Sequence, residues 1–296
     1  MRLRELLPRD RIASAVVLSV LLYFCLFHYR AILELFRSVF YRGSLDQFVT
    51  GKAEWVGLEN IINLFNDPVF FGCLKTTLLT AIVFVPAVVL TSLILAILIN
   101  GIKNTILRNF FIAGIFLPYV MPIIASCVIW SIVLDSSPGG MVNTLLGYLN
   151  IPPIPWLISE LHIPVSISIV KVWHYVGFNT LIFLGGLMMI PDVYYESAEL
   201  DGAGIWAKFR HVTVPMLMPF ILFVSITSTL NTMLTFVEPL GLLGIITPGG
   251  IGDFVVFRMM NYRYRMLGIA TTYGLALLVI IIVITLIQRK LLEVKY

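Results

Sequence analysis

Six long stretches of apolar residues constrain this chain more than any other feature of its sequence. They lie at about 12–34, 76–100, 109–134, 163–190, 214–237 and 266–288. A helix needs about 20 mostly apolar residues to cross the roughly 30 Å hydrocarbon core of a bilayer. Charged residues make up only 12% of the chain, whereas a soluble domain carries about 25%. The sequence therefore predicts an all-α membrane protein with six transmembrane helices.

Two further uncharged stretches, 136–159 and 239–252, are too broken to be spans. The first contains Pro138 and the run 152–155, and the second contains Pro248-Gly249-Gly250. Proline removes a backbone donor and breaks a continuous helix, which lipid does not tolerate. We therefore predict both stretches to be loops. Prolines in the spans also predict kinks, except where they sit in the first turn of a helix: Pro86, Pro118, Pro122, and Pro215 and Pro219, which open the fifth span.

The distribution of basic residues predicts the orientation of the chain. The segments 1–11, 100–108, 191–211 and 289–296 hold 11 Lys and Arg in 49 residues, whereas 30–75, 135–162 and 238–265 hold 8 in 102. Cytoplasmic loops carry the excess of Lys and Arg. The first group of segments, and with it both termini, is therefore predicted to be cytoplasmic, in a multi-pass protein of the cell (inner) membrane. The first span is predicted to be retained, because no small-residue cleavage site follows it.

The sequence lacks the motifs that are typical of several other classes of protein. Cys25, Cys73 and Cys127 are isolated and fit neither a disulfide framework nor a metal site. No cluster of basic and aromatic residues indicates a nucleic-acid partner. The one Gly-Lys pair, Gly51-Lys52, lacks the spacing and hydroxyl of a phosphate-binding loop. Neither a His-Glu-x-x-His nor a Gly-x-Ser-x-Gly sequence occurs. We predict no catalysis and no metal in this chain.

The connection between the fourth and fifth spans, 191–215, carries the most informative pattern. Glu196-Ser197-Ala198 is followed by Gly202 after three residues, and Val-Thr-Val-Pro at 212–215 follows after nine more. This pattern resembles the signature of ABC-importer permeases, which reads Glu-Ala-Ala, three residues, Gly, nine residues and Ile-x-Leu-Pro. Three residues differ from the signature: Ser197 replaces the first Ala, Val212 replaces Ile and Val214 replaces Leu. Each replacement keeps the size class of the side chain. An amphipathic linker with solvated acidic residues is the alternative, but it would not need to keep this spacing.

The residue types in this connection predict a helical turn. The segment from Glu196 to Asp201 suits a short helix, and Gly202 can adopt the left-handed conformation that ends one. Ala203 onward suits a second short helix at a new angle, before Pro215 opens the next span. In the family this element docks in a cleft on the ATPase subunit. The resemblance therefore implies the following ATPase-coupling residues: Glu196, Ser197, Ala198, Asp201, Gly202, Ala203 and Pro215.

The resemblance covers nearly the whole chain and favours the maltose-type and glycerol-phosphate-type sugar permeases. It is carried by the segments at 55–60, 64–68, 116–120, 153–157 and 172–179, in this order. The chain departs from the group at the short glycine-rich stretch 247–250 and in a first span without a proline near its outer end. The resemblance implies a type I importer permease with a cytoplasmic coupling-helix loop.

The same resemblance implies partners and a domain organisation. The partners are a second permease subunit, two ABC ATPase subunits that bind the ATP, an extracytoplasmic solute-binding protein and the membrane lipid. No cofactor is expected in this chain. The expected parts are 1–75 (tail, first span and extracytoplasmic loop), 76–290 (core permease domain) and 291–296 (cytoplasmic tail).

Polar side chains in the fifth span are candidates for the substrate pathway. Sugar recognition needs hydroxyl or amide groups and an aromatic face on helices that line a cavity. The candidates are Ser225, Ser228, Asn231 and Thr232, with Thr227 and Thr229 nearby. The alternative is hydrogen bonding within and between helices, which is common in membrane bundles.

The fourth span adds the candidates Lys171, Trp173, His174 and Asn179. A charged residue inside a span indicates a transport pathway by default. Lys171 lies about eight residues from the outer end of the span, or roughly 12 Å deep at 1.5 Å per residue. Two interpretations stay open at this point: the lysine snorkels to the membrane surface, or it pairs with an anionic substrate such as a sugar phosphate or a uronate.

A different class of protein, the secondary carrier, remains a competing hypothesis. Such carriers often show internal repeats and carboxylates inside their spans. This sequence shows no repeat, and no Asp or Glu lies in the middle of a predicted span. A membrane enzyme is disfavoured by the lack of paired acids at membrane depth.

Overall fold

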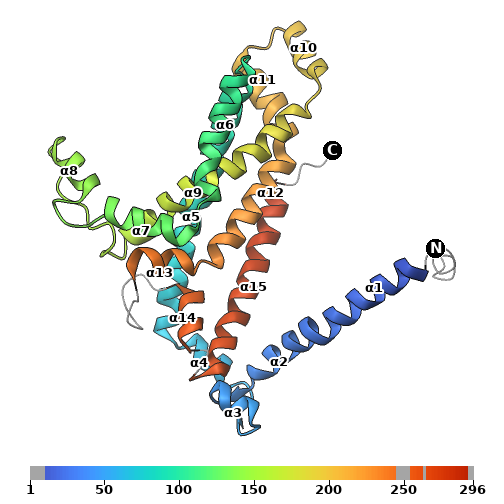
Figure 1. The fold of residues 1–296 in the computed structure, drawn as a ribbon, viewed down its shortest axis with the longest axis vertical. Coiled ribbons are helices and arrows are strands. Elements are labelled where there is room, and N and C mark those ends of the chain that lie inside the picture. The colour runs from blue at the N-terminus through green and yellow to red at the C-terminus, as the bar shows by residue number, and fades with distance from the viewer. Residues whose placement is uncertain (1–10, 245–253, 263–264, 293–296) are drawn as a thin grey trace. The chain divides into compact units, whose positions relative to one another are not determined.

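The computed structural model describes residues 11–244, 254–262 and 265–292, and these residues are mostly helical (Figure 1). The glycine-rich stretch 247–250 and most of the predicted tail at 291–296 lie outside the described residues. The chain divides into two compact units. One comprises Met1–Asp67 with Met259–Leu275, and the other comprises Pro68–Arg258 with Ala276–Tyr296.

The described helices match the six predicted spans. Five are long and apolar enough to cross a bilayer: Ser14–Ser38, Pro68–Asn100, His162–Met188, Ile205–Met233 and Leu267–Leu292. The sixth is a pair of helices, Thr105–Val120 and Ile123–Val133, that meet at an angle of 95°. Counted as one broken span, this pair brings the number to the six that the sequence predicts.

The break in the third span follows from the sequence at its centre. Helix α6 (Thr105–Val120) ends at Met121, whose backbone is extended with ψ 144°, and α7 (Ile123–Val133) begins after Pro122. A residue before proline is driven out of the helical region by the proline ring. Pro122 therefore forces the extended conformation at Met121 and with it the change of direction.

The first unit begins with a long helix that is followed by a small folded loop. Helix α1 (Arg11–Tyr23), a π-helical segment (Phe24–Tyr29) and α2 (Arg30–Ser38) are continuous. Strands β1 (Tyr41–Arg42) and β2 (Glu54–Trp55) pair antiparallel, and α3 (Leu45–Val49) lies between them in the chain. Helix α4 (Glu59–Phe65) is tied to this hairpin because Asn60 Nδ2 donates to the carbonyl oxygens of Val39 and Tyr41 at 2.8 and 2.9 Å.

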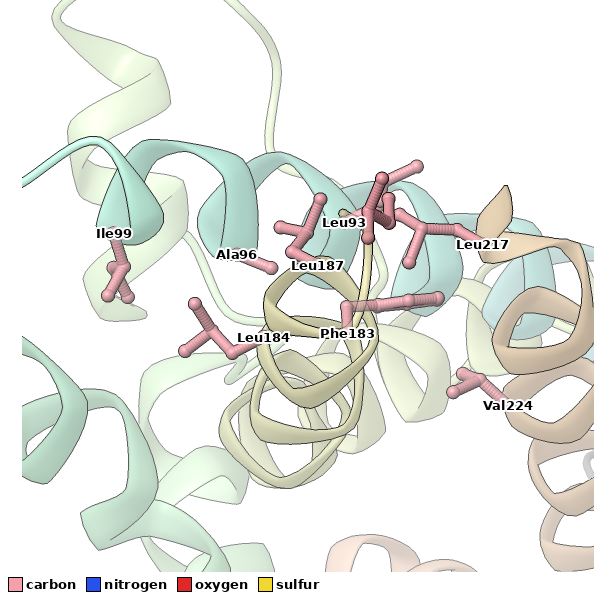
Figure 2. Close-up of a cluster of buried hydrophobic side chains, with 9 residues drawn as sticks. Leu93, Ala96, Ile99, Phe183, Leu184, Leu187, Leu217 and Val224 are labelled. Atoms are coloured by element: carbon pink, nitrogen blue, oxygen red, sulfur yellow. The ribbon is translucent and has the colours of Figure 1, made fainter. Parts of the chain in front are cut away.

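The second unit is built around α9 (His162–Met188), which packs against α5 (Pro68–Asn100), α6 and α12 (Val214–Met233). A buried cluster joins three of these helices (Figure 2). Its members are Leu93, Ala96 and Ile99 from α5, Phe183, Leu184 and Leu187 from α9, Ile190 after α9, and Leu217 and Val224 from α12. This cluster fixes the end of α9 that leads into the 191–215 connection.

Both stretches predicted as loops contain short helices, so those predictions were wrong in part. Helix α8 (Met141–Gly147) lies in 136–159, and α13 (Val237–Leu243) overlaps the start of 239–252. Proline is compatible with the first turn of a helix, which is where Pro239 sits in α13. In the described part of the chain, α14 (Val255–Tyr262) and α15 (Leu267–Leu292) follow.

Gly177 sets the distance between α6 and α9. A Cβ atom at this position would lie 2.0 Å from the Ile115 carbonyl oxygen and 2.8 Å from the Phe116 Cα, both backbone atoms of α6. Small residues allow such close helix contact in membranes. The segment at 172–179 therefore needs glycine at this point for packing.

Replacing Gly177 by alanine is expected to destabilise the protein by about 1–3 kcal/mol, the usual cost of overpacking. Gly185→Ala on the same helix is the matched control, because a Cβ there meets nothing within 4 Å. Thermal unfolding of the purified variants in detergent measures the difference. A Gly177→Ala variant as stable as Gly185→Ala would contradict the described packing.

Candidate functional site

The 191–215 connection forms an exposed helical turn. Helix α10 (Asp192–Leu200) has no buried residue, and Asp201 ends it. Gly202 has φ +76°, and the amides of Gly202 and Ala203 donate to the carbonyls of Glu199 and Ala198, each at 2.9 Å. This is the left-handed helix end that the sequence predicts at Gly202. The chain reverses there and enters the next helix.

The following helix differs from the expectation. Helix α11 (Ile205–Lys208), a π-helical segment (Phe209–Thr213) and α12 form one helical stretch, Ile205–Met233. A separate second short helix ending before Pro215 was therefore a wrong prediction. A π-helical turn bonds each amide one residue further back than an α-helix does, and it directly precedes Val214-Pro215. The first helix also begins earlier than predicted, at Asp192 instead of Glu196.

Six of the predicted coupling residues lie at the end of α10 and in the reversal that follows it, whereas Pro215 lies at the start of α12. Glu196, Ser197, Asp201 and Gly202 are exposed, whereas Ala198, Ala203 and Pro215 are half-buried. Large apolar side chains on the same turn are exposed as well: Leu200 is 90% exposed, Ile205 88% and Trp206 70%. A turn that presents both carboxylates and large apolar side chains is suited to docking on a partner protein.

Contacts inside the turn hold its two helices to each other. Lys208 Nζ forms an ion pair with Glu199 Oε1 at 2.5 Å, and the hydroxyls of Tyr195 and Thr213 lie 3.1 Å apart. A cavity of about 270 Å³ lies behind the turn, against the ends of α5 and α9, and Asn100 lines it. The two helices of the turn are therefore held to each other, and Tyr195 packs against the buried cluster at the base of the turn.

Lys171 lies at the centre of a second, buried polar cluster. Its side chain is 0% exposed, and its Nζ donates to Asn231 Oδ1 at 2.6 Å, Thr235 Oγ1 at 3.0 Å and Glu238 Oε1 at 2.6 Å. The interpretation of Lys171 as a snorkelling residue is therefore wrong. An ammonium group has three N–H donors, and here each has an acceptor within the chain.

Aromatic rings complete the surroundings of this ammonium group. Its Nζ lies 5.4 Å from the centroid of the Phe84 ring and 5.5 Å from that of Tyr175. Both distances fall within the range of cation–π attraction. The partner carboxylate of Glu238 is only 6% exposed. Lys171 and Glu238 thus form an ion pair that is almost wholly buried.

Sequence reasoning did not identify Glu238, which lies just beyond the predicted fifth span in the second residue of α13. Two signals pointed to it. A lysine at membrane depth needs a counter-charge, and Glu238 directly follows a predicted span. Asp135 directly follows another, so these signals do not single out Glu238. The structure also brings Asn231 of α12 into hydrogen-bond contact with Lys171 of α9. The sequence analysis names both residues as candidates but does not predict this contact.

The remaining substrate-pathway candidates have mixed surroundings. His174 and Asn179 are each 4% exposed, and Trp173 is half-buried against Trp130. The His174 ring contacts Tyr119 and Tyr175, and among the described residues its buried Nδ1 has no hydrogen-bond partner. Tyr119 in turn stacks on Phe178, with ring centroids 4.7 Å apart.

The hydroxyls of α12 make mostly structural hydrogen bonds. Thr229 and Thr232 donate to the backbone carbonyls of Ser225 and Ser228, each at 2.9 Å, and Gln288 Nε2 donates to Thr229 Oγ1 at 2.7 Å. Ser225, Ser228 and Thr232 are all buried. The alternative of bonding within and between helices therefore accounts for Thr229 and Thr232 in this conformation.

Comparison with known proteins places these features in a family. Residues 74–292 match the family model described as "Binding-protein-dependent transport system inner membrane component". The arabinooligosaccharides transport system permease protein AraP of Bacillus subtilis is 31% identical over 254 residues, covering 84% of this chain and 79% of AraP. The probable ABC transporter permease protein YurN of the same organism is 30% identical over 292 residues, 95% of this chain and 96% of YurN.

A solved structure shares the fold over the full length. It is a chain of a bacterial alginate ABC transporter in complex with an alginate pentasaccharide-bound periplasmic protein, with a TM-score of 0.78, 22% identity and 100% coverage of both chains. The six-span arrangement is thus that of a type I importer permease. The match spans the 191–215 turn and all the helices of the second unit. This chain belongs to the family of binding-protein-dependent transport system inner membrane components.

Proposed function

We propose that this chain is the permease subunit of an ATP-driven importer that takes up a sugar or an oligosaccharide delivered by a binding protein. The observation that carries the proposal is the exposed helical turn around Glu196 and Gly202. It combines the family spacing with a surface fit for docking, and it is fastened to two spans. The family is one of transport components, and the chain carries no sequence signal of an enzyme.

Four kinds of partner follow from this proposal. A second permease subunit completes the pathway, two ABC ATPase subunits bind the ATP, and an extracytoplasmic solute-binding protein delivers the substrate, within the lipid bilayer. The periplasmic protein in the related alginate transporter complex supports the last of these. The turn around Glu196 would dock on an ATPase subunit, and this docking would put the turn and both termini in the cytoplasm. The excess of Lys and Arg in the same segments agrees with this orientation.

Transport would proceed by alternating access. Loaded binding protein and closed ATPase subunits would favour an outward-facing cavity, and ATP hydrolysis would reset the inward-facing one. The energetic requirement is that these ligands bind one conformation better than the other. The 191–215 turn would convey the movement of the ATPase subunits, because one helical stretch, Ile205–Met233, leads from it into the membrane.

The substrate class rests on two observations. The name of the relative AraP refers to the transport of arabinooligosaccharides. In this chain, α9 and α12 supply aromatic and polar side chains of the kind that sugar recognition uses. His174, Asn179 and Ser228 are the pathway residues that we propose on these helices. Lys171 gives no support to an anionic substrate, because its charge is balanced by Glu238 and its three donors are used.

Purification tests this proposal. The tagged chain is expected to co-purify with a second permease and an ABC ATPase. In liposomes, the complex should hydrolyse ATP faster when its binding protein and a sugar are added. The sugars to screen are arabinotriose, lactose, maltotriose and a galacturonate trimer. Uptake that an ion gradient drives without nucleotide would instead support the secondary carrier.

A further inference from the structure

The helices on either side of the 191–215 turn are packed together near the turn itself. A Cβ atom at Gly186 of α9 would lie 2.7 Å from Leu217 Cδ2 and 2.8 Å from Phe220 Cδ2, both on α12. Phe183 and Leu187 join Leu217 in the same buried cluster (Figure 2). These contacts fasten the α9–α12 hairpin near the turn; we define this hairpin as His162–Met188, the turn, Val214–Met233 and the residues that follow to the end of α13 at Leu243.

The Lys171 ion pair fastens the opposite end of the same hairpin. Lys171 belongs to α9, and its three acceptors belong to the last turn of α12, to the residues that follow it and to α13. Fifteen residues separate Lys171 from Gly186, so the two fastening points lie about 23 Å apart along α9 at 1.5 Å per residue. The hairpin is thus fastened near the turn and again at this second point.

A polar connection at this position has a physical reason. Lipid tails are as apolar as leucine side chains, so apolar contacts alone give helices little reason to stay together in a membrane. Apolar surfaces also slide over one another without breaking a directional bond. Three hydrogen bonds from one buried ammonium group, shielded by the rings of Phe84 and Tyr175, fix both the distance and the register.

We propose that Lys171 and Glu238 are positioning residues for transport: their buried ion pair makes the α9–α12 hairpin move as a unit when the 191–215 turn is displaced. The inference rests on the proposed function, since it needs a partner ATPase that displaces the turn. With the far end fastened, a movement of the turn reaches the opposite half of the membrane. With that end loose, the two helices would separate and the movement would be lost before it opened the pathway.

The test compares sugar import per ATP hydrolysed in liposomes that contain the whole complex. The wild type first identifies the imported sugar from labelled arabinotriose, lactose and maltotriose. The double variant K171M/E238M removes both charges, so neither partner is left buried without a counter-ion. A loss of transport in this variant can therefore be distinguished from a loss of folding. The double variant R42M/E59M is the matched control, because Arg42 and Glu59 form an exposed ion pair outside the hairpin.

We expect K171M/E238M to assemble with its ATPase and to hydrolyse ATP, but to import at least fivefold less sugar per ATP than the wild type. The charge-reversed variant K171E/E238K should recover most of that ratio, and R42M/E59M should keep it. A wild-type ratio in K171M/E238M would overturn the proposal. So would failure of that variant to assemble, which would assign the pair to folding. A wild-type complex without sugar-stimulated hydrolysis would count against the proposed function instead.

Discussion

Lys171→Met is expected to destabilise the protein by about 3–5 kcal/mol, the cost of removing one partner of a buried ion pair. Glu238 would lose its counter-ion in a site where its carboxylate is only 6% exposed. Replacing both partners by apolar residues strands no charge and is often neutral. K171M/E238M should therefore recover most of the stability that K171M loses.

Thermal unfolding of the purified chain in detergent measures this effect. A loss of 1 kcal/mol shifts the midpoint by about 2–4 °C in a protein of this size class, so a drop on the order of 10 °C is expected for K171M. Arg42→Met is the matched control, since an exposed ion pair contributes about 0–1 kcal/mol. If K171M and R42M shifted the midpoint equally, Lys171 would have to be exposed to water, contrary to the structure.

Gly202→Val is expected to reduce ATP-driven uptake at least tenfold while leaving the protein in the membrane. Gly202 has φ +76°, and a β-branched residue is strongly disfavoured there. The variant must therefore change the direction in which the chain leaves α10. Because α10 makes few contacts with the rest of the chain, we expect the turn to be misplaced without unfolding of the bundle.

Gly204→Ala is the control for this second prediction. Gly204 lies two residues away with φ −71°, which alanine adopts without strain, and a Cβ there meets open space. Uptake and co-purification with the ATPase are compared for both variants. Equal uptake by G202V and G204A would show that the reversal at Gly202 has no role in coupling.

The spans were predictable because lipid imposes a simple requirement on length and apolar composition. Each of the six predicted segments has a helix or helix pair in the structure. The left-handed conformation at Gly202 was predictable as well, since glycine is the usual residue at that helix end. In both cases a local property of the sequence decides the outcome.

The Lys171–Glu238 pair could not be predicted, because it depends on how distant segments pack. Glu238 follows an apolar span and would be expected in water at the membrane surface. It becomes buried because α13 packs on α7, where a Cβ at Gly241 would lie 2.6 Å from the Cys127 Cβ. The orientation of α7 depends in turn on the 95° break before it. The sequence shows Pro122 but not the angle it produces.

In the proposed mechanism, a separate ATPase drives this chain through the 191–215 turn. The most direct measurement of this mechanism is sugar uptake into liposomes by the purified complex, with ATP or with a non-hydrolysable analogue, for the wild type and for a chain whose residues 192–204 are replaced by a glycine–serine linker. We predict uptake only with ATP and only with the native turn. Uptake by the linker variant, or by the wild type without hydrolysis, would contradict the account.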